Sequence, residues 1–138
     1  IGNANPAALM HANAGFEAVN KIGLPEAEIV LANMVTFLAC SPKSNASYSA
    51  LKAAKKAVAE TGDLPVPLHL RNAPTKLMRD LGNGKDYLYP HDFPNAFTQQ
   101  EYMPEALHGR VLYDPADNTR EREMRKALAQ QWKDKYGY

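Results

Sequence analysis

The stretch 64–84, LPVPLHLRNAPTKLMRDLGNG, places three prolines and two glycines between flanks of helical pattern, and it limits the possible folds more than any other part of the chain. Pro65 and Pro67 fix their own φ angles and disfavour the α region for the residue before each, so the chain crosses here extended or in a tight turn. We expect one short turn at 68–73 and then a helix of about two turns that starts at Pro74, with Asn72 as its cap and Gly82 as its end. So short a helix is not stable alone in water, and other parts of the chain must hold it.

Residues 5–23 carry the first helical pattern. Asn5 and Pro6 are typical of a cap and a first helical residue, apolar residues then recur at steps of three and four, and Gly23 ends the segment. The apolar stripe is narrow and rich in alanine, which permits a close neighbour helix. Gly15 lies in its middle at a cost of about 1 kcal/mol relative to alanine, so we expect it to mark close backbone packing.

Two further helical segments follow. The segment 24–40 is apolar on nearly all sides, and because such a helix is typically buried, we expect it to be the core helix, with Cys40 as an inert thiol. The third segment covers 46–60 and ends at 61–62, and either Ser44 or Asn45 is its cap.

From Lys85 to Asp117 no period of 2 or 3.6 residues organises the sequence. So long a segment without regular structure is unusual in a compact domain unless it is functional or packed by its own side chains, and its aromatic content argues against disorder. We expect an ordered loop that wraps the helices, with one turn at 103–107. The aromatic residues are Tyr87, Tyr89, Phe93, Phe97, Tyr102 and Tyr113.

A final helix is predicted from 118 to the end of the chain. Asn118 or Thr119 caps it, and Met124, Leu128 and Trp132 share one side. Alternating strand patterns are almost absent, so the predicted fold class is all-α. We expect one domain over 1–138, with a helical core at 1–84, a wrapping loop at 85–117 and a C-terminal helix at 118–138 that docks on its own subunit or on another.

Composition excludes several classes of function. A formal charge of +1 gives no global field that would attract nucleic acid or an acidic partner. Cys40 is the only cysteine, so neither an intramolecular disulfide nor a multi-thiolate metal site can form, and a reducing compartment is expected. No apolar run reaches membrane-spanning length. We therefore expect a soluble cytoplasmic fragment of a longer protein, because the chain starts at Ile1 rather than at a methionine.

Signals for catalysis are weak. Residues 82–86, GNGKD, resemble a phosphate loop, but Asp86 stands where the Walker pattern needs Ser or Thr, and a helix stop followed by a turn is the ordinary interpretation. His69, His91 and His108 lack the spacing of a helical metal site, so a metal-dependent hydrolase at His69 and His91 is a minor alternative. No G-x-S-x-G nucleophile setting is present. We expect no catalytic residue, metal or cofactor in this chain.

One cluster joins cationic, amide, imidazole and phenol side chains, and it is the candidate site. These groups could hydrogen-bond the proline-broken backbone, form a subunit interface or contact nucleic acid, since Arg and Tyr suit the last two roles equally. The candidate residues are His69, Arg71, Asn72, Lys76, Arg79, Tyr87, Tyr89 and His91.

Five blocks of sequence carry a resemblance to a known family. They are IGNANP at 1–6, SPKSN at 41–45 followed by Tyr48, LPVPLHLRNAPTKLM at 64–78, YPHD at 89–92 and YMPE at 102–105. Over essentially its whole length the chain resembles the C-terminal region of the replication-associated recombination AAA+ ATPases. These are the bacterial RarA or MgsA proteins, which are related to the eukaryotic Werner-helicase-interacting protein.

The resemblance implies an all-helical collar domain similar to the C-terminal domain of clamp loaders, which assembles the parent protein as a homotetramer. It also implies that the parent is a DNA-dependent ATPase with ATP and Mg²⁺ as cofactors, acting in DNA repair and recombination at stalled replication forks. DNA and single-stranded-DNA-binding protein are its implied partners, and the bacterial cytoplasm near the nucleoid is its implied location. The family's Walker motifs, arginine finger and sensor region have no counterpart in these residues, so no catalytic residue is carried over.

Two hypotheses come from different classes of function. The first is an oligomerisation module that joins subunits through the Ala-rich stripe of the first helix or through the aromatic loop. The second is a DNA-contacting or partner-protein-docking module in which Arg71, Lys76, Arg79 and Lys85 meet phosphates.

Overall fold

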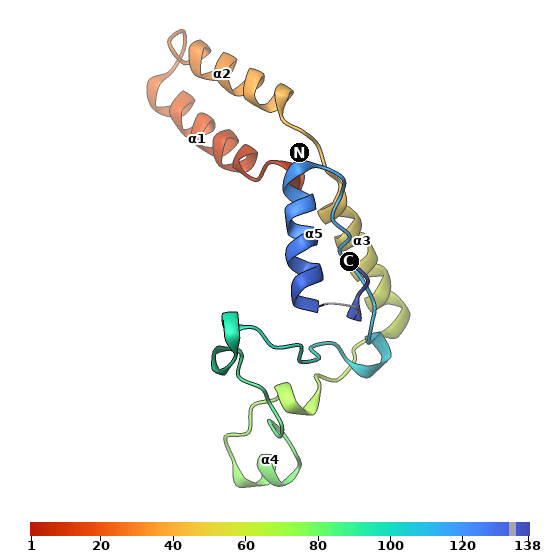
Figure 1. Ribbon diagram of the computed structural model, residues 1–138. Helices are drawn as coiled ribbons and strands as arrows, with labels where there is room; N and C mark the ends of the chain where they lie inside the picture. The colour runs from red at the N-terminus through yellow and green to blue at the C-terminus, as the bar shows by residue number, and fades with distance from the viewer. Residues whose placement is uncertain (133–134) are drawn as a thin grey trace. The chain divides into compact units, whose positions relative to one another are not determined.

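The computed structural model describes residues 1–132 and 135–138 (Figure 1). No β-strand occurs among these described residues, which confirms the all-α fold class. The α-helices are α1 (Ala7–Ile22), α2 (Ala27–Cys40), α3 (Ala46–Thr61), α4 (Lys76–Asp80) and α5 (Thr119–Trp132). Short 3-10 turns lie at Gly2–Ala4, Leu68–Leu70, Pro90–Asp92, Pro94–Ala96 and Glu105–Leu107.

The chain divides into two compact units. Unit 1 contains residues 1–53 and 112–126, and unit 2 contains residues 54–111 and 127–138. In each unit, segments from distant parts of the sequence come together. Unit 1 holds the α1–α2 pair and the start of α5, whereas unit 2 holds the proline-rich stretch and most of the aromatic loop.

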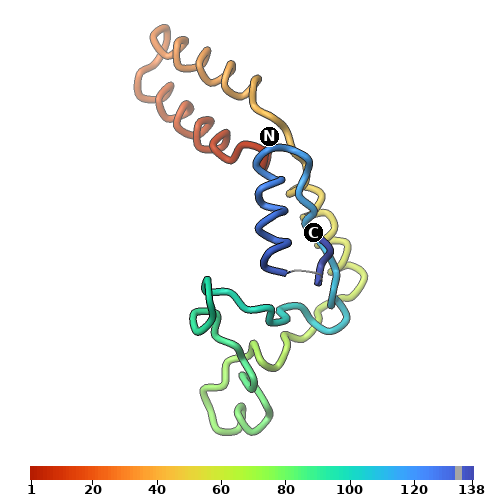
Figure 2. The backbone as a smooth tube through the Cα atoms, in the orientation of Figure 1, coloured from red at the N-terminus to blue at the C-terminus, as the bar shows by residue number. Residues whose placement is uncertain are grey.

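Helices α1 and α2 pack as an antiparallel pair in unit 1, visible as the red and orange helices in Figure 1 and as the same pair of coils in Figure 2. Gly15 of α1 is buried, and a Cβ added to it would lie 1.5 Å from the sulfur of Met34 in α2. The prediction that Gly15 marks close packing is therefore confirmed. A tilted ring contact between His11 and Phe37, with centroids 4.2 Å apart, adds to the pair.

The prediction that 24–40 forms a buried core helix is wrong for this chain. Ala27 is the buried residue of α2, whereas Ile29 is 80% exposed and Val35 is 64% exposed. Cys40 is exposed as well, so the expectation of a thiol enclosed in an apolar helix is also wrong. The physical reason is that α2 uses one side to pack on α1, and the described residues provide no second layer over its other sides.

Local signals located most helix ends but not every cap. Gly23 and Gly62 follow the ends of α1 and α3 with positive φ angles, as predicted. For α4 the cap is Thr75, whose hydroxyl accepts a hydrogen bond from the Met78 N–H at 3.2 Å, so the predicted start at Pro74 with Asn72 as the cap is wrong. Threonine is a good cap because its oxygen satisfies a backbone donor that the first turn leaves unpaired.

Asn5 does not cap α1 through its side chain either. Its amide donates to the Ser41 hydroxyl at 3.0 Å, and Pro6 stands at the N-cap position. The side chain thus joins the entry of α1 to the exit of α2 within unit 1.

The aromatic loop contains turns but encloses few of its rings. A 3-10 turn at Glu105–Leu107 falls inside the predicted 103–107, and Phe97 meets Trp132 edge to face with ring centroids 5.0 Å apart. Four other rings of the loop are exposed, so its own aromatic side chains enclose little of it. These are Tyr87, Tyr89, Phe93 and Tyr102.

Across the described residues, no helix combines the length and the hydropathy that crossing a bilayer requires.

Candidate functional site

Part of the predicted cluster forms a hollow in unit 2. The hollow has a volume of about 460 Å³ and is lined by His69, Leu70, Arg71, Asn72, Ala73, Gly84, Tyr87 and Tyr102. Its shape starts with Pro65 and Pro67, which keep the approach extended before the short turn at Leu68–Leu70. The chain then returns through α4, and the Gly84 N–H donates to the Leu68 carbonyl at 2.8 Å. Gly84 has a φ of +71°, and a Cβ there would lie 3.4 Å from the Arg71 carbonyl oxygen, so this crossing favours glycine.

The cationic side chains of the cluster bind backbone carbonyls. Arg71 Nε donates to the Val66 carbonyl at 2.6 Å, and Arg79 Nη1 donates to the Ala73 carbonyl at 3.2 Å. His69 Nε2 lies 2.7 Å from the Glu101 carbonyl, and because a carbonyl only accepts, Nε2 carries the hydrogen. These contacts match the first of the three roles considered for the cluster, in which its side chains hydrogen-bond the backbone that the prolines interrupt.

The structure brings four of the eight candidate residues together and leaves four outside. His69, Arg71, Asn72 and Tyr87 line the hollow. The other four are exposed and do not line it: Lys76 and Arg79 lie on α4, while Tyr89 and His91 contact each other with ring centroids 5.1 Å apart. In the described part of the chain no group of three or more potential ligands could hold a metal, so nothing joins His69 and His91 to a third donor.

Tyr102 and Glu101 were not predicted as site residues. Tyr102 lines the hollow, and the Glu101 carboxylate accepts from the backbone N–H groups of Tyr102 and Met103 at 3.0 and 2.9 Å. Burial alone would raise the pKa of Glu101, but the Met103 hydrogen bond and the Lys135 ammonium outweigh it and hold the pKa below its ordinary value. Sequence offered no periodic signal here, because the arrangement depends on a contact between distant segments.

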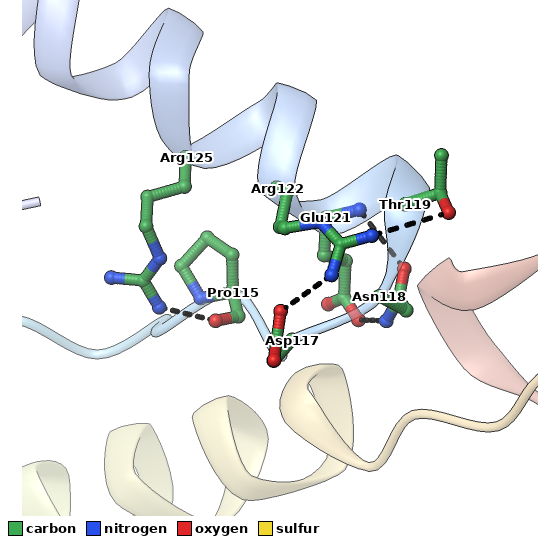
Figure 3. A network of polar contacts seen from close by, with 7 residues as sticks. All are labelled: Pro115, Asp117, Asn118, Thr119, Glu121, Arg122 and Arg125. Carbon is green, nitrogen blue, oxygen red and sulfur yellow. Dashed lines mark hydrogen bonds and ion pairs between the residues drawn. The ribbon is translucent and has the colours of Figure 1, made fainter.

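A second polar cluster, in unit 1, surrounds the start of α5 (Figure 3). Glu121 is fully buried, and its carboxylate accepts from Tyr113 Oη at 2.7 Å and from Asn118 Nδ2 at 2.6 Å. The Asn118 side-chain oxygen accepts the Glu121 N–H at 3.0 Å, which makes Asn118 the cap and resolves the earlier choice between it and Thr119. The pattern of a cap residue followed three positions later by Glu could have revealed this reciprocal pair from sequence.

Hydrogen bonds determine the titration of this cluster. Burial by itself would raise the pKa of Glu121, but donors from Ser44, Tyr113, Asn118 and the Ala116 backbone together lower it. For Tyr113, burial and then the hydrogen bond to Glu121 raise the pKa of the phenol. Glu121 is therefore ionised at neutral pH, and Tyr113 is its neutral donor.

Arginines complete the start of α5 on the exposed side. Arg122 pairs with Asp117 at 2.8 Å, and Arg125 pairs with Asp114 at 2.6 Å and donates to the Pro115 carbonyl. Figure 3 shows both guanidinium groups reaching from α5 to the segment that precedes it. Asn3 donates to Tyr113 Oη at 3.0 Å, so the cluster also joins the first residues of the chain.

A third feature of the chain is apolar. Large side chains stand exposed along α1, α2 and the turn between them, and we call this set the hairpin surface. Its members are Leu9, Met10, Phe16, Ile22, Leu24, Ile29, Leu31 and Val35. Four charged residues lie among them in the sequence: Glu17 and Lys21 pair with each other at 3.4 Å, and Glu26 and Glu28 are exposed near the turn.

Comparison with known proteins identifies the family of this chain. Residues 1–132 match the family described as MgsA AAA+ ATPase C terminal. The chain belongs to this family. As an MgsA C-terminal region, it confirms the resemblance that the sequence blocks carried.

Individual relatives agree with this assignment. The chain is 46% identical over 129 residues to Replication-associated recombination protein A of Coxiella burnetii, covering 93% of this chain and 29% of that protein. It is 42% identical over 130 residues to the protein of the same name in Escherichia coli K12, covering 94% and 29%. The protein named ATPase WRNIP1 in Dictyostelium discoideum is 36% identical over 115 residues, covering 83% and 13%. This MgsA C-terminal region thus spans less than a third of the length of these relatives.

Proposed function

We propose that this chain is the self-assembly domain of an AAA+ ATPase that acts in replication-associated recombination, and that it joins four copies of the protein. The observation that carries the proposal is the hairpin surface. So many exposed large apolar side chains on two short helices exceed the scattered apolar residues of an ordinary surface, and apolar patches mark interaction sites.

The burial pattern supports an interface rather than a sparse core. The buried apolar residues of the described chain are all alanines, while the large apolar side chains of the hairpin surface are exposed. Interfaces of permanent oligomers are more apolar than ordinary surface and depleted of charge. The small-residue stripe of α1, by contrast, packs on α2 through Gly15, so it is used inside the chain.

A second copy is the occupant that fits best. Residues 7–40 carry four charged side chains, and Glu17 and Lys21 neutralise each other, so like-charge repulsion between two copies is confined to Glu26 and Glu28 near the turn. A segment of the longer protein outside these residues is the competing occupant. It would cover the hairpin surface without changing the number of chains in the particle.

Light scattering coupled to size-exclusion chromatography tests the assembly. We expect four times the mass of one chain for the longer protein, and Ile29→Gln should shift the mass toward the monomer. Leu81→Gln, at a position 64% exposed in unit 2, is the matched control and should leave the mass unchanged. A tetramer that persists in Ile29→Gln and in a Leu9→Gln/Ile29→Gln variant would contradict the proposal.

The activity of the longer protein is proposed from the family to which this chain belongs. It would bind ATP and Mg²⁺ in a part of the protein outside these residues, hydrolyse ATP in response to DNA, and contact single-stranded-DNA-binding protein in the bacterial cytoplasm. No catalytic role is proposed for the residues of this chain, because no Walker motif is present in the sequence.

A second candidate function is contact with single-stranded nucleic acid at the hollow around Arg71. Tyr87 and Tyr102 are 45% and 43% exposed there, and aromatic rings beside cationic groups suit stacking of unpaired bases. Residues 64–85 carry four cationic side chains against the single carboxylate of Asp80.

Fluorescence anisotropy with a labelled oligonucleotide separates this candidate from the first. If bases stack in the hollow, Tyr87→Ala should weaken binding about tenfold, while Tyr48→Ala on α3 should not. Equal affinities of the two variants would assign any nucleic-acid binding to another part of the protein.

A further inference from the structure

Glu101 connects two parts of unit 2 that are far apart in sequence. One carboxylate oxygen accepts the N–H groups of Tyr102 and Met103, and the other lies 2.9 Å from Lys135 Nζ. The side chains of Lys135 and Glu101 are 26% and 20% exposed, so solvent screens this ion pair less than it screens a pair on the open surface.

Aromatic contacts hold the same C-terminal residues in place. The Lys135 ammonium lies 5.1 Å from the ring centroid of Trp132 and 5.4 Å from that of Tyr136, within the range of cation–π attraction. Trp132 packs edge to face on Phe97, and Gln99 donates to the Gln131 carbonyl at 2.9 Å. The end of α5 and the Lys135 side chain are thus attached to the segment 97–101.

The same segment shapes the hollow. The Glu101 carbonyl accepts the hydrogen bond of His69, and Tyr102 follows directly, so two lining residues of the hollow depend on the position of Glu101. Lys135 itself is not part of the lining. Its influence on the hollow must pass through Glu101.

We propose that Trp132, Lys135 and Tyr136 form a clasp that holds the hollow in shape through Glu101. When the clasp is closed, it fixes the backbone N–H groups of Tyr102 and Met103 and the Glu101 carbonyl that accepts the hydrogen bond from His69. When Lys135 leaves, the Glu101 carboxylate loses its counter-charge, and the segments carrying His69 and Tyr102 gain freedom. Salt weakens ion pairs, so the clasp responds to ionic strength.

Hydrogen exchange of the longer protein, read by mass spectrometry, tests the clasp. In Lys135→Met, we expect exchange about fivefold faster or more in peptides covering 68–72 and 100–104, as a lost charge-assisted hydrogen bond allows local opening. Peptides from α1 and α2 should exchange as before. Lys126→Met, at an exposed position on α5 with no ion pair in the described structure, is the matched control.

Two further arms keep the proposal falsifiable. Glu101→Gln should reproduce the effect of Lys135→Met, and the double variant should add little to either, because both remove one interaction. The unaltered protein should show a smaller local acceleration at the same peptides in concentrated salt, because the pair is screened only in part, and this arm requires no substitution. Unchanged exchange at 68–72 in Lys135→Met and in salt would overturn the clasp, as would acceleration that is equal in α1 and α2.

This result does not depend on assembly. A tetramer with an unresponsive hollow would refute the clasp alone, and a monomer with a responsive hollow would refute the proposed function alone.

Discussion

At the scale of single residues, the best-determined feature is a carboxylate rather than an apolar core. Glu121 is the one large side chain in the described residues that is fully buried, and its carboxylate accepts hydrogen bonds from several donors. A buried charge is tolerable only when donors replace the water it has lost. Here those donors come from two stretches of sequence, Ser44 and the segment 113–118, so the residue specifies which segments meet.

Replacing Glu121 with glutamine should therefore destabilise the protein. The amide NH₂ cannot accept from Tyr113 or Asn118, and unpaired donors remain buried, so we expect a loss of about 2 kcal/mol in the free energy of unfolding. Urea unfolding followed by circular dichroism measures the change. Glu123→Gln, on the exposed side of the same helix, should alter stability by less than about 0.5 kcal/mol, and equal losses in the two variants would contradict the role given to Glu121.

The same residue determines part of the acid sensitivity. Because the pKa of Glu121 is lowered in the folded state, the unfolded chain binds more protons near pH 4.5, the ordinary value of a glutamate. The stabilisation is present above that pH and is lost as the pH falls through the folded pKa. Unfolding curves measured across acid pH should show the unaltered protein approaching the stability of Glu121→Gln, and a gap that widens on acidification would contradict this assignment.

At the scale of elements, the α1–α2 pair depends on one small residue. A leucine at Gly15 would collide with Met34 and part the two helices, so we expect Gly15→Leu to lower the free energy of unfolding by about 2 kcal/mol despite the better helix propensity of leucine. Ala14→Leu, at an exposed neighbouring position, adds the same bulk without the contact. If both variants unfold at the same urea concentration, the close packing at Gly15 does not contribute to the free energy of unfolding.

Elements were also what the sequence predicted best, because their signals are local. Gly23, Gly62 and the periodic apolar residues locate α1 and α3 without knowledge of any neighbour. Thr75, rather than Asn72, caps α4, because both residue types suit a cap and only the path of the chain around Pro74 decides between the two positions. For the Glu121 cluster, Asn118 three positions earlier was a sequence signal for the cap. The burial of Glu121 depends on Tyr113 and Ser44, and no local sequence pattern predicts that these residues lie close to it.

Burial was the part that local patterns could not supply. The segment of α2 is apolar on nearly all sides, and that pattern indicates that something covers the helix without indicating which chain does so. In this chain the side chains of Ile29 and Val35 are exposed to solvent. The apolar pattern of this segment thus predicted a burial that the described residues do not provide. The hollow was predicted in part, because His69, Arg71 and Asn72 are neighbours in sequence while Tyr102 is not.

At the scale of the whole molecule, stability should depend on concentration. Because the buried apolar residues of the described chain are alanines, its own core contributes little, and under the proposed assembly contacts between copies supply most of the apolar stabilisation. We expect the thermal midpoint of the protein to rise with protein concentration, as measured by scanning calorimetry over about a 100-fold range. Ile29→Gln should flatten that dependence, and a midpoint independent of concentration in the unaltered protein would show that one chain is sufficient.

The exposed thiol at the end of α2 affects how such experiments must be conducted. Cys40 is the last residue of α2, which carries three of the eight residues of the hairpin surface, and it is the only cysteine in the sequence. In air, two such thiols on different molecules can oxidise to an interchain disulfide. The product would be a covalent dimer with the mass of a genuine assembly intermediate. A reducing agent, or the Cys40→Ser variant, distinguishes non-covalent association through the hairpin surface from a covalent dimer linked by a disulfide.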